Sequence, residues 1–289
     1  MCDERTEADD AAFLVRTGQT RRGFGALSLA ALAACATPPS DPHEVSEQDV
    51  QVTTPDGVAD AYFVHPATRR HAGVLMWPDI LGIRPAFRTM GKRLAQSGYA
   101  VLVVNPYYRT RQGAVVSEGE SFSDPPVRER LTGLARTLTP QTQAVDGRAF
   151  VEYLDAQRVV DTRRKVGVMG YCMTGAFMLR TAAAMPERVG AGASFHGGGL
   201  VTDSPESPHL LASRVRGSYL FAVAQNDDER DPNAKTALRD AFAAANVPAE
   251  IEVYPARHGW CALDSQAYDQ VQADRAWARC LALFSTALA

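Results

Sequence analysis

A cysteine stands where its residue type and its neighbours could support nucleophilic catalysis. Residues 166–175 read VGVMGYCMTG, an apolar run that leads through Cys172 into a pattern typical of a helix. A side chain on so sharp a strand-to-helix turn needs small neighbours, which Gly170 and Gly175 supply, although Thr174 takes the place of a second expected glycine. A helix start favours a thiolate, so Cys172 is a candidate nucleophile, the alternative being a buried structural cysteine.

A cysteine nucleophile needs a histidine base and an acid that orients the histidine. In α/β-hydrolases these follow the nucleophile along the chain in the order acid, then histidine. His258 comes just after a strand predicted over 251–254, where this order requires the base. Asp227 follows a strand predicted over 218–224 and is the preferred acid. The adjacent Asp228 is the alternative, and spacing alone does not choose between them.

Two more histidines follow the candidate nucleophile. His196 comes directly after a predicted strand, in the stretch Phe195-His196-Gly197-Gly198, and is interpreted as pocket wall or as a structural histidine. His209 lies in a loop rich in proline and serine, which indicates a solvated side chain. Neither position suits the base as well as that of His258.

The elements that must position these residues alternate between short apolar strands and amphipathic helices. Strands are predicted over 73–77, 100–104, 166–169, 189–194, 218–224 and 251–254, and helices over 87–97, 141–156, 175–184, 234–245 and 268–288. This alternation predicts an α/β fold with a mostly parallel central sheet and helices on both faces. The candidate triad then lies at the carboxyl ends of the strands, where open α/β sheets bind ligands.

Two segments interrupt the alternation. Residues 50–64 hold two apolar runs around the turn signal Pro55-Asp56-Gly57, which predicts an antiparallel strand pair at one edge of the sheet. Residues 109–140 are polar and contain Pro125-Pro126. Such a long connection predicts an excursion above the sheet that serves as a lid or a pocket wall.

The first 36 residues have the layout of an export signal. Arg21-Arg22 precede a mildly apolar stretch rich in alanine and leucine, which resembles a twin-arginine signal. Its end has two interpretations, cleavage after Ala36 or lipidation of Cys35 in a lipobox-like Leu-Ala-Ala-Cys. The sequence thus predicts an exported protein, periplasmic or lipid-anchored, with a linker over 37–48 and one catalytic domain over 49–289.

Composition and charge exclude several classes of protein. The net charge is -3 and no basic stripe is present, so nucleic acid is not an expected partner. No apolar run is long enough to span a bilayer. The five cysteines include no C-x-x-C pair, and no phosphate-binding loop or metal-ligand cluster is visible, so no cofactor and no metal are expected. The expected partner is a small-molecule substrate, and the oligomeric state is left open.

From Val50 to Ala289 the chain resembles the dienelactone hydrolase (carboxymethylenebutenolidase) family of the α/β-hydrolase superfamily. The residues that carry the resemblance are Trp77-Pro78-Asp79-Ile80-Leu81-Gly82, Asn105-Pro106-Tyr107-Tyr108-Arg109, Gly170-Tyr171-Cys172-Met173, Phe195-His196-Gly197-Gly198, Asn226-Asp227 and His258-Gly259-Trp260. The resemblance implies an α/β-hydrolase fold, a Cys-His-Asp triad, and hydrolysis of an enol lactone or related ester through a thioester.

The resemblance also implies roles around the triad. The backbone N–H groups of Ile80 and Met173 are expected to form an oxyanion hole. A carboxylate that modulates the nucleophile is implied at Asp79, where the family's archetype has a glutamate. Substrate contacts are expected from Tyr108, Arg109, His196 and Trp260, with a solvated side chain as the alternative for Arg109. A second substrate arginine of the archetype is Ala262 here, which, with Asp79, Thr174 and the predicted export, argues against dienelactone itself.

Two other classes of function remain open at this point. One is a binding protein of the same fold that has lost its chemistry, and the departures at Thr174 and Asp79 leave room for it. The other is a thiol redox protein in which Cys261 resolves Cys172. A pairing of Cys261 with Cys280 would instead keep the thiol of Cys172 out of any disulfide.

Overall fold

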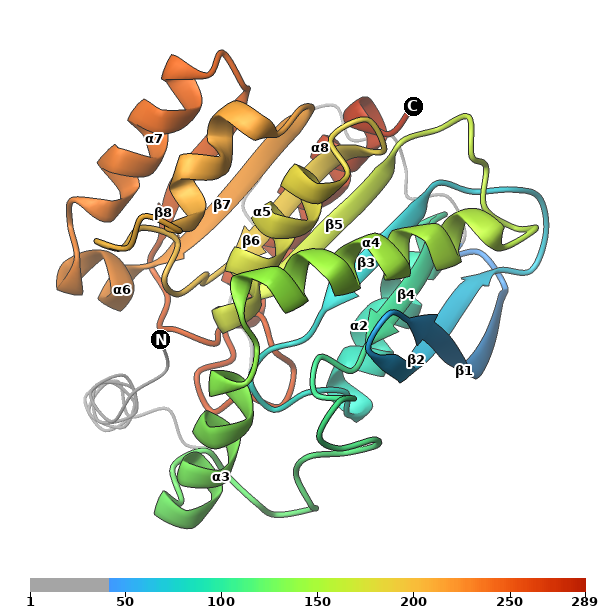
Figure 1. Cartoon of the computed structure of the whole chain (residues 1–289), viewed down its shortest axis with the longest axis horizontal. Coiled ribbons are helices and arrows are strands. Elements are labelled where there is room, and N and C mark those ends of the chain that lie inside the picture. The colour runs from blue at the N-terminus through green and yellow to red at the C-terminus, as the bar shows by residue number, and fades with distance from the viewer. Residues whose placement is uncertain (1–41) are drawn as a thin grey trace, which may run out of the picture.

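The computed structural model describes residues 42–289, so the predicted export signal and Cys35 lie outside the described part of the chain. An eight-stranded sheet has the order β1-β2-β4-β3-β5-β6-β7-β8 (Figure 1). The strands are β1 (Val45–Thr54), β2 (Gly57–Pro66), β3 (Gly73–Trp77), β4 (Ala100–Val104), β5 (Val166–Tyr171), β6 (Val189–Phe195), β7 (Ser218–Ala224) and β8 (Ala249–Tyr254). The helices are α2 (Pro85–Gln96), α3 (Pro125–Arg136), α4 (Pro140–Ala156), α5 (Gly175–Ala184), α6 (Gln225–Arg230), α7 (Ala234–Ala244) and α8 (Gln270–Ala287), with 3-10 turns η1 (Cys172–Thr174) and η2 (Pro208–Arg214).

The sheet is parallel from β4 to β8, and β1 and β2 form an antiparallel pair at one edge. The predicted α/β architecture and the edge pair are thereby confirmed. β1 begins at Val45, inside the segment predicted as a linker. Its first half is mostly exposed and polar, and Glu47 accepts a hydrogen bond from the hydroxyl of Tyr62 on β2. Such an edge strand lacks the apolar alternation by which strands are recognised.

Helices cover both faces of the sheet and give it two cores. Figure 1 shows α4, α5 and α7 on the near side and α8 on the far side. Along β3 the side chains alternate: Val74 and Met76 pack in the core with α2 and α8, and Leu75 and Trp77 pack in the core with α4 and α5. Because both faces are buried, the strand reads as a continuous apolar run, as predicted.

The excursion over residues 109–140 contains a helix, α3, that the sequence did not predict. Only Val127 and Leu131 of this helix are buried, so its apolar stripe is short. These two side chains join a third, smaller cluster with Ile80, which lies just after β3. The excursion therefore packs against the carboxyl edge of the sheet and forms the predicted wall there.

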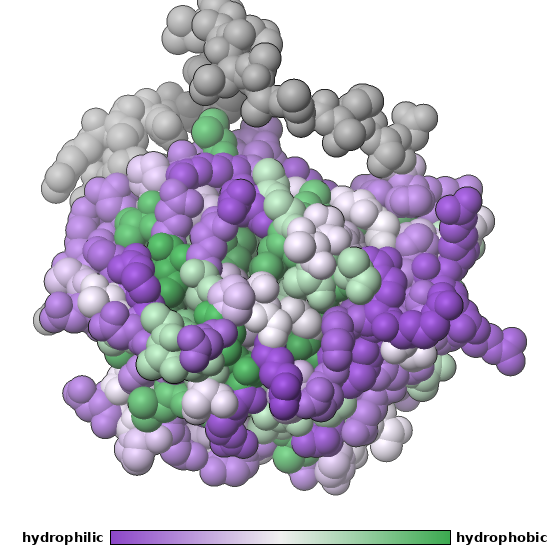
Figure 2. Space-filling model, turned by 90° about the horizontal axis from the view of Figure 1, so that it is seen from above, coloured by the Kyte–Doolittle hydropathy of each residue, from purple (hydrophilic) through white to green (hydrophobic). Residues whose placement is uncertain are grey.

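The surface is mostly polar. In Figure 2 hydrophilic side chains prevail around the edge of the molecule, and hydrophobic ones show in smaller patches between them. Among residues 42–289, the large hydrophobic side chains that are exposed are Val58, Leu210, Leu263 and Val271, which belong to four different segments. Among the helices of residues 42–289, none combines the length and the apolar character needed to cross a membrane.

The connection from β5 into α5 is a tight turn that leaves no room for a side chain at two of its positions. A Cβ atom on Gly170 would lie 2.1 Å from the carbonyl oxygen of Thr174. A Cβ atom on Gly175 would lie 2.4 Å from Oγ of Ser194 on β6. Contacts this short are sterically forbidden, so both positions require glycine for the turn to close.

We therefore expect Gly170→Ala to lower the free energy of unfolding by about 3 kcal/mol, because the methyl group has to displace backbone of the turn. Chemical denaturation measures this change. Gly133→Ala is the matched control, since a Cβ atom there meets nothing within 4 Å. In helix α3 the same substitution should raise stability by about 0.5 to 1 kcal/mol. Equal effects at the two positions would contradict the steric account.

Candidate active site

Cys172 is the first residue after β5 and lines a large cavity. Its φ angle is +56°, in the left-handed region that non-glycine residues rarely occupy. The side chain is 2% exposed and contributes to the wall of a cavity of about 1010 Å³. A strained residue at the end of a buried strand, facing a cavity, is the geometry of a nucleophile elbow.

Thr174 replaces the second expected glycine and takes part in holding this turn. Its hydroxyl accepts a hydrogen bond from the backbone N–H of Tyr171 at 2.8 Å. The same oxygen lies 3.0 Å from the carbonyl oxygen of Trp77 at the end of β3. The threonine is fully buried, so its hydroxyl joins the turn to the neighbouring strand. The close approach to β6 that a glycine permits falls to Gly175 instead.

Asp227 and His258 are in direct contact. Nδ1 of His258 lies 2.6 Å from Oδ2 of Asp227. Asp228 points elsewhere and binds Nζ of Lys235 at 2.7 Å. Both aspartates belong to the short helix α6, in which successive side chains point about 100° apart. Only one of two adjacent carboxylates can face the histidine, and it is Asp227.

The electrostatics of the site favour a charged histidine. Burial opposes a charge on His258, but the Asp227 carboxylate and the Cys172 thiolate, which His258 also hydrogen-bonds, outweigh it and raise the pKa of the imidazole. Burial likewise opposes a charge on Asp227, and the attraction of His258 nevertheless lowers the pKa of that carboxyl group. The three side chains thus form one coupled acid-base chain that ends at the cavity.

Asn226 holds the backbone of the histidine, a role that the sequence analysis did not assign. Its Oδ1 accepts the N–H of His258 at 2.8 Å, and the residue is buried. The stretch Asn226-Asp227 belongs to the family resemblance, which marks Asn226 as a residue of interest. Its role could not be predicted from the sequence, because its partner is a backbone group 32 residues away.

His196 lines the same cavity as the cysteine and His258. Its ring centroid lies 4.8 Å from that of His258 and 5.3 Å from that of Trp260. Burial and the neighbouring His258 hold the pKa of His196 well below the ordinary value, so the ring is neutral. Neither ring nitrogen of His196 has a hydrogen-bond partner among the described residues. A buried polar group in this condition is rare, and these nitrogens can serve a bound molecule.

The structure does not bring the other three predicted substrate contacts, Tyr108, Arg109 and Trp260, to the cavity. Two nitrogens of Arg109 each bind Asp146 of α4 at 2.7 Å, and Asp146 also accepts the hydroxyl of Tyr108 at 2.8 Å. Arg109 also pairs with Asp56 between β1 and β2. The two residues therefore connect secondary-structure elements and do not line the cavity.

Trp260 packs against His196, which lines the cavity. It is fully buried and stacks on Tyr254 with a centroid distance of 5.4 Å. Its other neighbour is the ring of His196. Trp260 thus packs against His196 and does not itself line the cavity.

Asp79 lies in the cavity wall, where Arg84 binds both of its oxygens at 2.6 and 2.9 Å. Its Oδ1 also accepts the N–H of Leu81 at 2.9 Å. The N-cap position of α2 is Arg84, and no side-chain hydrogen bond caps that helix, so Asp79 does not serve as its cap. The modulation of Cys172 by Asp79 stays a prediction.

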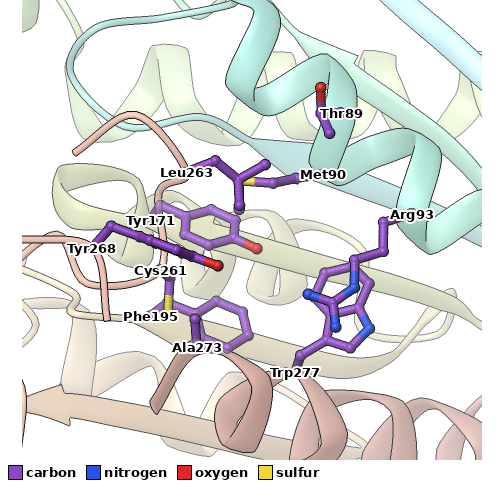
Figure 3. A pocket seen from close by; sticks show the side chains of 10 residues that line it. All are labelled: Thr89, Met90, Arg93, Tyr171, Phe195, Cys261, Leu263, Tyr268, Ala273 and Trp277. Atoms are coloured by element: carbon purple, nitrogen blue, oxygen red, sulfur yellow. The ribbon is translucent and has the colours of Figure 1, made fainter. Parts of the chain in front are cut away.

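The other described cysteines do not line the cavity that contains Cys172. Cys261 contributes to a separate cavity of about 40 Å³ with Tyr171, Phe195 and Trp277 (Figure 3). Cys172, Cys261 and Cys280 are all buried, and none of them is in a disulfide. The geometry therefore does not favour a redox pair of Cys172 with Cys261. Over residues 42–289 no group of three or more histidine, cysteine or acidic side chains is arranged to hold a metal ion.

Two known proteins of similar sequence are a carboxymethylenebutenolidase and a putative one. The chain is 26% identical over 225 residues to a carboxymethylenebutenolidase of Rhodococcus opacus, which covers 76% of this chain and 82% of that protein. It is 27% identical over 288 residues to a putative carboxymethylenebutenolidase of Methylorubrum extorquens, which covers 94% of this chain and 95% of the relative.

Solved structures show the same fold. A putative dienelactone hydrolase from Klebsiella pneumoniae superimposes with a TM-score of 0.73 at 22% identity and covers 84% of this chain and 100% of its own. The dienelactone hydrolase-like promiscuous phosphotriesterase P91 from metagenomic libraries gives 0.68 at 21% identity over 85% of this chain and 99% of its own. The family model described as "Dienelactone hydrolase family" matches residues 59–288. The chain therefore belongs to the dienelactone hydrolase family.

Proposed function

We propose that the protein hydrolyses carboxylic esters or lactones, with Cys172 as nucleophile, His258 as base and Asp227 as the group that orients the base. The observation that carries the proposal is the continuous contact from Asp227 through His258 to Cys172 at the wall of the large cavity. The name carboxymethylenebutenolidase, borne by the similar proteins, supports a lactone or ester bond as the target.

The chemistry runs in two stages. His258 holds the proton of Cys172, and the thiolate attacks the carbonyl carbon of the substrate. The tetrahedral adduct collapses to a thioester as the C–O bond breaks, and His258 gives its proton to the departing oxygen. A water molecule then loses a proton to His258 and adds to the thioester. The C–S bond breaks, the acid is released, and Cys172 and His258 return to their starting state.

The oxyanion of each adduct needs hydrogen-bond donors, and the backbone N–H groups of Ile80 and Met173 are the proposed ones. Met173 is the second residue of η1, at a helix start where N–H groups lack partners within the helix. Ile80 lies in the cavity wall, and its carbonyl oxygen accepts the hydroxyl of Tyr107 at 2.8 Å. That bond fixes the peptide next to the proposed donor.

The first test replaces the nucleophile. Cys172→Ala should lower kcat/KM for para-nitrophenyl esters by at least about 1,000-fold, since no thioester can form. Mass spectrometry of the quenched wild type should show an acyl group on Cys172. Cys261→Ala is the matched control, because that thiol faces the separate small cavity, and it should keep both the activity and the adduct. Rates of both proteins at the uncatalysed background would move the assignment to a binding protein, and equal rates above that background would overturn Cys172 as the nucleophile.

The second test separates the two adjacent aspartates. Asp227→Asn should lower kcat on the order of 1,000-fold, because an amide neither favours the required tautomer nor stabilises the imidazolium. Asp228→Asn removes only an ion pair with Lys235 near the surface and should stay within about twofold of wild type. The opposite ranking of the two variants would make Asp228 the acid.

The third test uses pH and unfolding instead of activity. The raised pKa of His258 stabilises the folded protein below the ordinary imidazole value of 6.5, and this stability is lost as pH rises through the raised value. The lowered pKa of Asp227 stabilises the folded protein above pH 3.8. This stability is lost as the pH falls through the lowered pKa. The melting temperature of wild type should therefore exceed that of Asp227→Asn most between about pH 4 and 6.5. A gap that widens from pH 7 to pH 10 would contradict the coupling.

A further inference from the structure

The cavity in front of Cys172 contains one lysine or arginine among its described lining residues, and this residue is Arg84. Its side chain is only 6% exposed, and its guanidinium lies over the ring of Phe87. Any substrate group that carries a negative charge would have to find its cation here or at the triad. In the triad the charge of His258 is already matched by Asp227 and Cys172.

Arg84 has no hydrogen-bond donor left for a substrate. A guanidinium has five N–H groups. Asp79 receives one from Nη1 at 2.6 Å and one from Nη2 at 2.9 Å. Asp264 receives one from Nε at 2.7 Å and one from Nη2 at 2.8 Å. The fifth, on Nη1, lies 3.3 Å from the carbonyl oxygen of Gly82. Two carboxylates therefore outweigh the single charge of this arginine.

The other acidic groups of the wall add to the negative charge. Glu120 is paired with Arg130, which binds both of its oxygens at 3.0 and 2.6 Å. Glu118 lines the cavity as a further carboxylate. Asp79 and Asp264 both pair with Arg84, so the described cavity walls contain more carboxylates than cations. The field in the cavity consequently disfavours an anion.

We propose that this cavity accepts uncharged esters or lactones and rejects substrates that carry a carboxylate, and that Asp264 sets this specificity by occupying Arg84. The inference rests on the proposed hydrolytic function of the same site and names its substrate class. Asp264 follows His258 by six residues on the loop after β8, and Arg84 precedes α2, so the pair joins two walls of the cavity. Asp264 is a positioning residue, since it acts on the substrate through Arg84.

A pair of esters tests the proposal on the wild type. Para-nitrophenyl pentanoate and mono-para-nitrophenyl glutarate share one leaving group and differ in a terminal methyl or carboxylate. The specificity constant kcat/KM for the glutarate should be at least about 10-fold below that for the pentanoate, since a charged group loses water without gaining a donor. A glutarate ester that is hydrolysed as well as the pentanoate, or better, would overturn the proposal.

Two variants locate the specificity. Asp264→Ala frees two donors of Arg84 and removes one charge, so the ratio of kcat/KM for glutarate to that for pentanoate should rise at least about 10-fold. Glu118→Gln is the matched control, since it removes one charge from the cavity wall and frees no donor of Arg84, and its ratio should rise less than about threefold. A ratio that rises equally in both variants, or in neither, would remove Asp264 from this role.

A binding measurement separates this inference from the proposed hydrolysis. The para-nitroanilides of pentanoic and glutaric acid are amide analogues whose dissociation constants can be measured by calorimetry on wild type, Cys172→Ala and Asp264→Ala. Wild type and Cys172→Ala should bind the neutral pentanoic analogue at least about 10-fold more tightly than the charged glutaric analogue. Asp264→Ala should reduce that difference in affinity. If the esters are hydrolysed without Cys172 but this preference holds, the triad assignment fails and the specificity stands. Equal binding of both analogues to wild type would overturn the specificity.

Discussion

The hydrogen bond between Asp227 and His258 is the interaction on which the rest of the site depends. Both side chains are largely buried, and a buried ion pair is tolerated only when its geometry is good and its surroundings supply further bonds. Asn226 supplies one such hydrogen bond, which it accepts from the backbone N–H of His258. Helix α6 orients Asp227 toward the histidine. Parallel strands bring these parts together, because β7 and β8 end at the same edge of the sheet as β5, which Cys172 follows directly.

The second constraint is the strained turn at Cys172. A positive φ angle costs conformational energy, which the structure around the turn must offset. Strand β5 is buried along its whole length between two helical layers, and the hydroxyl of Thr174 ties the turn to β3. Thr174 departs from the usual glycine pattern, and the neighbouring Gly175 makes this departure possible. The close contact with Ser194 lies at Gly175, one residue later than the pattern expects, so position 174 can carry a side chain.

The ion pairs around Arg84 serve structure and specificity at once. They join the loop after β3, the start of α2 and the loop after β8 across the mouth of one cavity. Carboxylates that hold an arginine in this way also keep it from a ligand. Under the proposed specificity, this site keeps its acid-base chain while Asp264 changes the charge of the group that the cavity accepts.

The sequence by itself determined the α/β fold and the three strand ends that carry Cys172, Asp227 and His258. Apolar runs report burial, and parallel strands must end at one edge. It left α3 unrecognised because only a short stripe of that helix is buried. The tertiary structure alone decided which of two adjacent aspartates faces the histidine, and it placed Arg109 on Asp146 instead of at the cavity. A charged side chain takes its partner from residues distant in sequence, and local patterns of hydrophobicity carry no information about that choice.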